Sequence, residues 1–162
     1  MTEDFDLRLA AANIASLLTG RHTLSVAESC TGGFLGATLT DVPGASGFFI
    51  GGAAVYSNHS KEKVLGVAPL TLKRFGSVSA EVAKEMAEGA VRTFGSDLSV
   101  AITGISGPGG GSPQKPVGLA FIAVSDGRTT KIEEFRFSKD RNGNRQESVW
   151  HAMKLLSEFV GD

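Results

Sequence analysis

Short apolar runs alternate with segments of helical periodicity along this chain, and that alternation narrows the folds it can adopt. Segments in which apolar side chains recur every three or four residues predict helices at 4–19, 32–40, 61–65, 79–94 and 142–160. Continuous or alternating apolar runs predict strands at 22–29, 48–57, 98–103, 117–125 and 131–137. Strands separated by helices favour a mostly parallel sheet that helices cover on both faces.

The last part of the pattern differs, because two expected strands follow each other directly around DGRT, residues 126–129. Such a pair forms a hairpin and adds antiparallel strands to the sheet. We therefore expect an α/β fold, a three-layer α/β/α sandwich with a mostly parallel, mixed central sheet. No linker, internal repeat or low-complexity segment divides the sequence, so residues 1–162 are expected to form one domain.

Composition argues against several classes of partner and site. Lys and Arg number 16 against 17 Asp and Glu, the net charge is −1, and no Lys/Arg-rich run occurs, so we expect no nucleic-acid partner. The acidic start lacks the pattern of a signal peptide, and no run of about 18 apolar residues exists, which predicts a cytoplasmic protein with no membrane contact. One cysteine and three widely spaced histidines predict no metal site.

Two possible nucleophiles, Ser29 and Cys30, stand side by side in SVAESCTGG, residues 25–33. They follow an expected strand and precede an expected helix, where a nucleophile lies exposed beside the helix N-terminal amides. The alternative for the serine is a helix cap, which Thr31 can also provide. The alternative for the cysteine is a packed core side chain. The residues alone leave these alternatives open.

A serine nucleophile needs a base, and the candidate is Lys61 in YSNHSK, residues 56–61. A free lysine has a pKa near ~10.4, so a lysine base must be buried or lie beside another cation to be neutral at pH 7. By spacing alone, Lys61 is typical of a solvated helix face.

The sequence GISGPGGGSPQKP, residues 104–116, joins two expected strands through 13 residues, of which five are Gly and three are Pro. A connection of that length without secondary structure is uncommon in a compact domain and is usually functional or disordered. Its glycines let backbone amides approach a ligand closely, which suits a phosphate or an oxyanion. Neither GxxxxGK[ST] nor GxGxxG occurs, and an ordinary flexible loop is the alternative.

Several motifs together resemble the C-terminal domain of the CinA (competence/damage-inducible) family. The matching stretches are AESCTGG (27–33), YSNHSK (56–61), LGV (65–67), GSVSAEVAKEMAEGA (76–90), TGISGPGGGSPQKPVG (103–118) and DRNGNRQ (140–146). The chain resembles the stand-alone, single-domain members, which are nicotinamide-nucleotide amidases, and not the larger members with an additional N-terminal domain. The resemblance implies hydrolysis of nicotinamide mononucleotide (NMN) to nicotinic acid mononucleotide and ammonia without a cofactor, in a homo-oligomer. A nucleotide-binding module of the same family without turnover is the alternative.

The resemblance also implies roles for residues at the matching positions. Ser29 is the implied nucleophile and Lys61 the general base. Tyr56 and Thr103 line the reacting centre, and the proton passes to Lys61 directly or through one of them. The amides implied for the oxyanion are those of Thr31, Gly32 and Gly33. The positions implied for ribose and phosphate are Asn58, Gly104, Gly107, Gly109, Gly110 and Arg145.

Two departures from the family pattern bear on these roles. His59 stands where the family usually has an acidic residue, and a protonated His59 would lower the pKa of a nearby Lys61. Gly143 and Asn144 are poor helix formers and predict a later start for the last helix, which makes Arg141 a weaker candidate than Arg145. An amidase that uses Cys30 in place of the serine is the remaining chemical alternative.

Overall fold

The central element is a five-stranded sheet in the computed structural model, which describes residues 5–161. Its strands are β1 (Leu24–Glu28), β2 (Phe49–Ala54), β3 (Leu98–Gly104), β4 (Leu119–Ser125) and β5 (Thr130–Arg136). They lie in the order β2-β1-β3-β4-β5. Strand β1 is parallel to its neighbours β2 and β3, whereas β4 is antiparallel to both β3 and β5. The sheet is mixed, as the sequence predicts.

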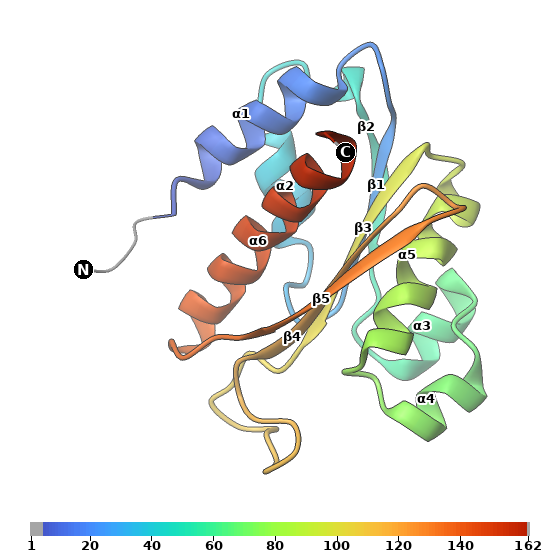
Figure 1. Ribbon diagram of the computed structural model, residues 1–162, viewed down its shortest axis with the longest axis vertical. Helices are drawn as coiled ribbons and strands as arrows, with labels where there is room; N and C mark the ends of the chain where they lie inside the picture. The colour runs from blue at the N-terminus through green and yellow to red at the C-terminus, as the bar shows by residue number, and fades with distance from the viewer. Residues whose placement is uncertain (1–4, 162) are drawn as a thin grey trace.

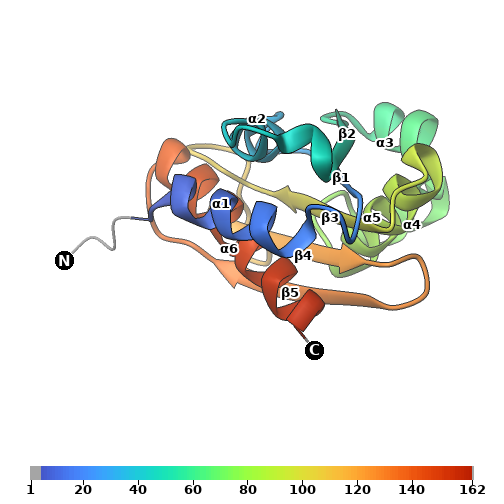
Figure 2. The same ribbon diagram turned by 90° about the horizontal axis from the view of Figure 1, so that it is seen from above.

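Helices cover both faces of this sheet. They are α1 (Leu7–Leu18), α2 (Phe34–Thr40), α3 (Asn58–Leu65), α4 (Pro69–Phe75), α5 (Ala80–Phe94) and α6 (Arg141–Gly161), with a short 3-10 turn η1 (Ala45–Gly47) before β2. Helices α1, α2 and α6 lie on one face, and α3, α4 and α5 lie on the other (Figures 1 and 2). The expected three-layer α/β/α sandwich is confirmed.

Alternating side chains along the strands explain why the two layers differ in their core. Val26, Val100 and Ile102 point into the core beneath α1, α2 and α6. Their neighbours Ala27 and Ala101 point into the core beneath α3 to α5. Large branched side chains fill one layer, whereas alanines on the other face let α5 pack closely against the sheet.

Most predicted elements form within a few residues of their expected bounds. Position 4, where the first helix was expected to begin, lies outside the described residues, and α1 begins after Asp6, whose side chain accepts the Leu9 N–H. Ser79 caps α5 as predicted, by accepting the Val82 N–H. Helix α4 was not predicted.

The expected late start of the last helix is wrong, since α6 begins at Arg141. The Asp140 carboxylate accepts the Gly143 N–H at 2.8 Å and so caps the first turn. The Asn144 side chain is buried, accepts the Lys139 N–H at 3.0 Å and donates to the Ser106 carbonyl at 3.0 Å. These bonds offset the low helix propensity of this segment and attach α6 to the glycine-rich loop.

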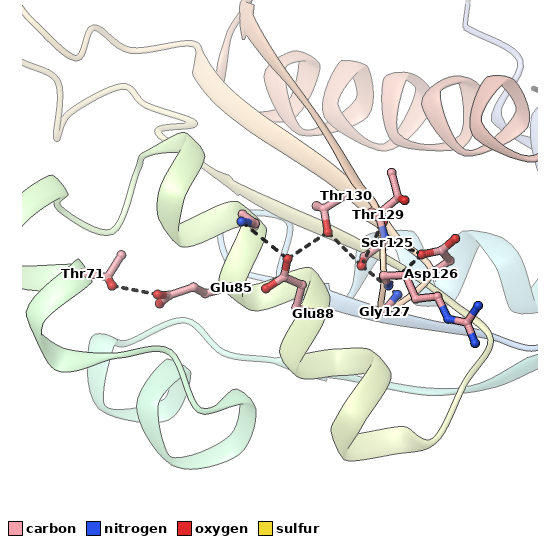
Figure 3. Close-up of polar contacts among 10 residues, drawn as sticks. Thr71, Glu85, Glu88, Ser125, Asp126, Gly127, Thr129 and Thr130 are labelled. Atoms are coloured by element: carbon pink, nitrogen blue, oxygen red, sulfur yellow. Dashed lines mark hydrogen bonds and ion pairs between the residues drawn. The ribbon is translucent and has the colours of Figure 1, made fainter.

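Two carboxylates of α5 tie neighbouring elements to it (Figure 3). Glu85 accepts the Ala68 N–H at 3.0 Å and the Thr71 hydroxyl at 2.8 Å, which fixes the start of α4. Glu88 lies 3.1 Å from the Thr130 hydroxyl at the turn of the predicted hairpin. No helix among residues 5–161 is both long and apolar enough to cross a membrane.

Candidate active site

Ser29 and Lys61 meet at the carboxyl end of β1, although 32 positions separate them in the sequence. The Lys61 Nζ donates to Ser29 Oγ at 2.9 Å. It also donates to the carbonyls of Val55 at 2.8 Å and Tyr56 at 3.1 Å. The Lys61 side chain is 1% exposed and Ser29 is 8% exposed. The lysine is therefore a buried neighbour of the serine and not a solvated residue of a helix face.

The turn that carries Ser29 is fixed by the backbone. The Ser29 N–H donates to the Ile102 carbonyl of β3 at 3.0 Å, and the Gly32 N–H donates back to the Ser29 carbonyl at 3.1 Å. Gly32 and Gly33 have φ angles of 59° and 104°. Side chains other than glycine's rarely adopt such angles, so the glycine pair lets the chain reverse directly after the serine.

Glu28, and not Ser29 or Thr31, caps the helix that follows this turn. Its buried carboxylate accepts the Leu35 N–H at 2.8 Å, the Gly36 N–H at 3.0 Å and the Thr31 hydroxyl at 2.6 Å. The capping role considered for Ser29 is thus filled by its neighbour. The Ser29 hydroxyl is therefore available to contact Lys61. No local pattern in the sequence indicates that Glu28, and not Ser29, is the capping residue.

Replacing Glu28 with Gln is expected to lower the free energy of unfolding by about 2 kcal/mol, because hydrogen bonds to a buried charged group are lost or weakened. Urea denaturation followed by circular dichroism measures this change. The matched control is Glu134→Gln, which removes an exposed ion pair with Arg136 and should change the free energy by less than about 1 kcal/mol. Equal effects of the two substitutions would contradict the capping role.

The environment of Lys61 favours its neutral form. Burial lowers its pKa from the ordinary lysine value, because removing an ammonium from water is costly. The thiol of Cys30 acts in the opposite direction and to a lesser extent. His59, considered above as a cause of such a shift, is exposed at the start of α3 and is not among the causes.

The direction of this shift predicts the pH dependence of any reaction in which Lys61 is the base. Only the neutral amine accepts a proton, so kcat/KM should rise about tenfold per pH unit on the acid side and level off above the pKa of Lys61. The midpoint should lie below ~10.4, the ordinary lysine value. Initial rates in buffers of constant ionic strength measure the profile. A rate that falls as the pH rises from 6 to 9 would contradict a lysine base.

Cys30 has a different environment from its neighbour. Burial raises the pKa of its thiol, while a hydrogen bond with the Ser106 side chain partly opposes that effect. A thiol with a raised pKa carries little of the nucleophilic thiolate at neutral pH. This favours Ser29 over Cys30 as the nucleophile.

A cavity of about 470 Å³ opens in front of Ser29. Six of the residues predicted for the site line it, namely Ser29, Tyr56, Gly104, Gly107, Gly109 and Gly110. The other lining residues are Cys30, Gly76, Ser77, Val78, Ile105, Ser106, Ser112, Lys115 and Arg141. The turn of residues 29–33, named the nucleophile turn after the candidate nucleophile Ser29, thus meets the end of β2 and the glycine-rich loop around one space. This is expected from the carboxyl ends of neighbouring strands.

Other predicted site residues lie outside this lining. The hydroxyl of Thr103 donates to the carbonyl of Ser77 at 2.8 Å and so helps to hold Ser77, which lines the cavity. Asn58 is exposed at the start of α3. Arg145 donates to the Thr31 carbonyl at 2.9 Å, and its guanidinium lies 5.6 Å from the centre of the Phe34 ring.

The remaining predicted positions follow Cys30 along the nucleophile turn. Thr31 is fully buried, with its hydroxyl on Glu28, and Gly32 is exposed. Gly33 lines a separate cavity between α2 and β2. None of these three residues is among those that line the cavity in front of Ser29.

The cavity is lined by Lys115, which the sequence did not single out, and by Arg141, which the sequence ranked below Arg145. Arg141 donates to the Gly107 carbonyl at 2.7 Å and lies 3.3 Å from the Tyr56 hydroxyl, which it contacts through its second Nη atom. Lys115 donates to the Phe75 carbonyl at the end of α4. Lys115 and Arg141 are the two cationic side chains that line the cavity. Their signal in the sequence was weak, because Lys115 is a single lysine in a glycine-rich loop and Arg141 precedes the two poor helix formers.

No group of three or more His, Cys, Asp or Glu side chains within residues 5–161 could hold a metal ion. The reactive groups that the site brings into contact are the Ser29 hydroxyl and the Lys61 amine. A hydroxyl in contact with a buried amine is the arrangement of an activated serine nucleophile.

The sequence and the fold of this chain both match known proteins. Residues 6–160 match the family described as the CinA C-terminal domain. A CinA-like protein from Chlorobaculum tepidum is 47% identical over 150 residues, which are 89% of this chain and 35% of that relative. The crystal structure of competence/damage inducible protein CihA from Agrobacterium tumefaciens has a TM-score of 0.93 and 37% identity, covering 97% of this chain and 96% of that chain.

A competence-damaged protein (CinA) superfamily protein from Escherichia coli has a TM-score of 0.90 and 30% identity, covering 98% of this chain and 93% of that chain. The chain spans 33% to 38% of the length of the curated relatives it matches.

Proposed function

The chain belongs to the CinA C-terminal domain family, and we propose that it is an amidohydrolase that converts NMN to nicotinic acid mononucleotide and ammonia. The observation that carries this proposal is the 2.9 Å contact between Lys61 Nζ and Ser29 Oγ at the wall of a cavity. A buried lysine with a lowered pKa next to a serine hydroxyl is suited to amide hydrolysis without a metal.

The proposed reaction has two stages, the formation of an acyl-serine ester and the hydrolysis of that ester. Neutral Lys61 accepts the Ser29 proton as Oγ attacks the carboxamide carbon, and the negative charge moves to the amide oxygen. The resulting ammonium of Lys61 returns a proton to the leaving nitrogen, and ammonia departs from the acyl-serine ester. Water then hydrolyses the ester, with Lys61 again as base, and releases the carboxylic acid and free Ser29.

The surroundings of the pair support each of these roles. The carbonyls of Val55 and Tyr56 accept hydrogen bonds from Nζ and so stabilise the lysine when it carries the proton. Backbone amides of the turn that follows Ser29, from Thr31 to Gly33, are proposed to hold the oxyanion. Because Lys61 contacts Ser29 itself, we propose direct proton transfer, whereas the Thr103 hydroxyl is already bonded to Ser77.

The phosphate of NMN is proposed to bind near Lys115 and Arg141. They are the cationic side chains that line the cavity, and Gly109 and Gly110 of the glycine-rich loop line it as well. Arg145, the arginine expected from the sequence, is instead bonded to the nucleophile turn. Its proposed role is to hold the Thr31 carbonyl in place.

Replacing Lys115 with Met is expected to raise KM for NMN about tenfold with a small change in kcat, because one charge-assisted contact to the phosphate is lost. Nicotinamide riboside has no phosphate, so its kcat/KM should stay within about twofold of the unmodified protein's. Lys73→Met, at an exposed position of α4, is the matched control. Steady-state rates of ammonia release from both substrates are measured for the unmodified protein, Lys115→Met and Lys73→Met. A parallel loss for both substrates would contradict phosphate binding by Lys115.

The experiment that tests the function is an ammonia assay with NMN, nicotinamide and glutamine as substrates. We expect release from NMN and little from the other two, because neither contains the ribose phosphate. Tight binding of NMN by calorimetry without ammonia over several hours would instead support the nucleotide-binding alternative. Ammonia from glutamine alone would refute the proposed substrate class.

A further inference from the structure

The cavity in front of Ser29 has positive but no negative side chains in its wall. Lys115 and Arg141 line it, and no Asp or Glu is among the described residues that do so. The acidic residues next to the lining segments have other partners, because the Glu28 carboxylate caps α2 and the Asp140 carboxylate caps α6. A cationic group that enters this cavity therefore meets no carboxylate that could balance its charge.

NMN carries such a cationic group, because the ring nitrogen that is bonded to the ribose is positively charged. The carboxamide is attached directly to this pyridinium ring. Attack by Ser29 on the carboxamide carbon therefore requires the ring to lie in the cavity beside Ser29. Recognition of the ring rests on the proposed function and adds a requirement to it, namely a partner for the positive charge of the ring.

Tyr56 is the one aromatic residue among the described residues that line the cavity, and it is the single tyrosine of the chain. The other uncharged lining residues are glycines, serines, a cysteine and the aliphatic residues Val78 and Ile105. The face of an aromatic ring carries partial negative charge and attracts a cation that lies within about 6 Å of the ring centre. Tyr56 is therefore the lining residue best suited to a pyridinium ring.

Two contacts hold Tyr56 in place at the cavity. Its carbonyl accepts a hydrogen bond from Lys61 Nζ at 3.1 Å, and the same amine donates to Ser29 Oγ at 2.9 Å. Its hydroxyl accepts a hydrogen bond from an Nη atom of Arg141 at 3.3 Å. The residue is nevertheless 62% exposed, so much of its surface is free to contact a ligand. A side chain that is already held in this way loses little conformational entropy when a ligand stacks on it.

We infer that Tyr56 is a specificity-determining residue whose ring binds the cationic pyridinium ring of NMN. Offset stacking brings the positively charged ring against the negative face of the phenol. The phosphate that is proposed to bind Arg141 balances the guanidinium charge next to the Tyr56 hydroxyl. The cavity therefore favours the oxidised, cationic ring over its reduced, neutral form.

Calorimetry with the Ser29→Ala protein tests this inference, because binding is then measured without turnover. NMN and its reduced dihydropyridine form share the carboxamide, the ribose and the phosphate, and they differ in the charge of the ring. In the Ser29→Ala background, Tyr56→Leu should raise Kd for NMN about tenfold and Kd for the reduced form by less than about threefold. Tyr56→Phe keeps an aromatic face and should change Kd for NMN by less than about threefold.

Trp150→Leu in the same background is the matched control, since it removes an aromatic ring that lines a separate cavity between α1 and α6. It should leave Kd for both ligands within about twofold of the background value. Circular dichroism shows whether each variant is folded.

Three results would overturn the inference while the proposed function stands. They are an equal loss of both ligands in Tyr56→Leu, an unchanged Kd for NMN in that variant, and a Tyr56→Phe protein that binds NMN as weakly as Tyr56→Leu does. If the Ser29→Ala protein binds neither ligand, the proposed substrate is refuted and the inference falls with it.

The single tyrosine permits a second measurement that leaves Tyr56 unchanged. In Ser29→Ala protein prepared with isotope-labelled tyrosine, the labelled ring signals in the NMR spectrum belong to Tyr56 alone. Added NMN should shift these signals, because a stacked aromatic ring changes the magnetic field at the tyrosine protons, and the shift should saturate with the Kd that calorimetry gives. Ring signals that stay unchanged while NMN saturates the protein would overturn the inference.

Discussion

Replacing Ser29 with Ala is expected to reduce ammonia release from NMN by about 1,000-fold or more, because no other group then forms the bond to the carboxamide carbon. The lost hydroxyl is small and lies at the cavity wall, so the fold should be retained. A coupled enzymatic assay for ammonia measures the rate. NMN binding by calorimetry should persist, since the contacts proposed for the ribose and phosphate are elsewhere in the cavity.

The adjacent residue offers a matched control. Cys30→Ser changes one atom at a buried position next to the proposed nucleophile and leaves the Lys61 to Ser29 contact in place. We expect at least about half of the activity to remain, because the raised pKa of the Cys30 thiol makes it a poor nucleophile. Full activity in Ser29→Ala together with inactivation in Cys30→Ser would reverse the assignment and make this a cysteine amidase.

The fold was largely predictable from the sequence, because each strand and most helices have a local apolar pattern. Val26, Val100 and Ile102 alternate with small residues, and that pattern marks a strand between two layers. Helix α4 was missed because its seven residues bury only Leu72, and its position depends on Glu85, a partner 17 residues from the Ala68 amide. Contacts of that kind leave no periodic signal.

The candidate site was predictable only in part. Spacing left Ser29 and Cys30 equivalent and placed Lys61 on a solvated helix face, and the family resemblance selected the pair that the fold brings together. The burial of Lys61 follows from the packing of α3 against α5 and from the contact of Lys61 with Ser29, which no short segment of sequence specifies.

The two arginines also show why the sequence predicts the candidate site only in part. Arg145 has the more regular helical setting and was the better candidate by sequence, yet its guanidinium is bonded to the Thr31 carbonyl. Arg141 reaches the cavity because the buried Asn144 side chain fixes the start of α6 against the loop at Ser106. A long-range hydrogen bond thus decides which of the two arginines lines the cavity.

Replacing Lys61 with Met should also reduce ammonia release by about 1,000-fold, since general-base catalysis is lost while the side chain keeps much of its volume. Lys63→Met is the matched control, because Lys63 is exposed on the same helix and should retain activity. Lys61→Arg separates charge from basicity. Its guanidinium can donate to Ser29, Val55 and Tyr56, but its pKa above ~12 keeps it protonated and unable to accept the serine proton.

Both Lys61 variants should therefore be inactive, and the pH profile distinguishes loss of the base from a disturbed fold. Any residual activity of Lys61→Met should lack the acid-side rise of the unmodified protein, because the group that titrates is gone. Wild-type-like activity in Lys61→Arg would show that the lysine acts through its charge. The Ser29 proton would then have to leave by another route, for which the Tyr56 hydroxyl, which lies 3.3 Å from Arg141, is one candidate among the residues that line the cavity.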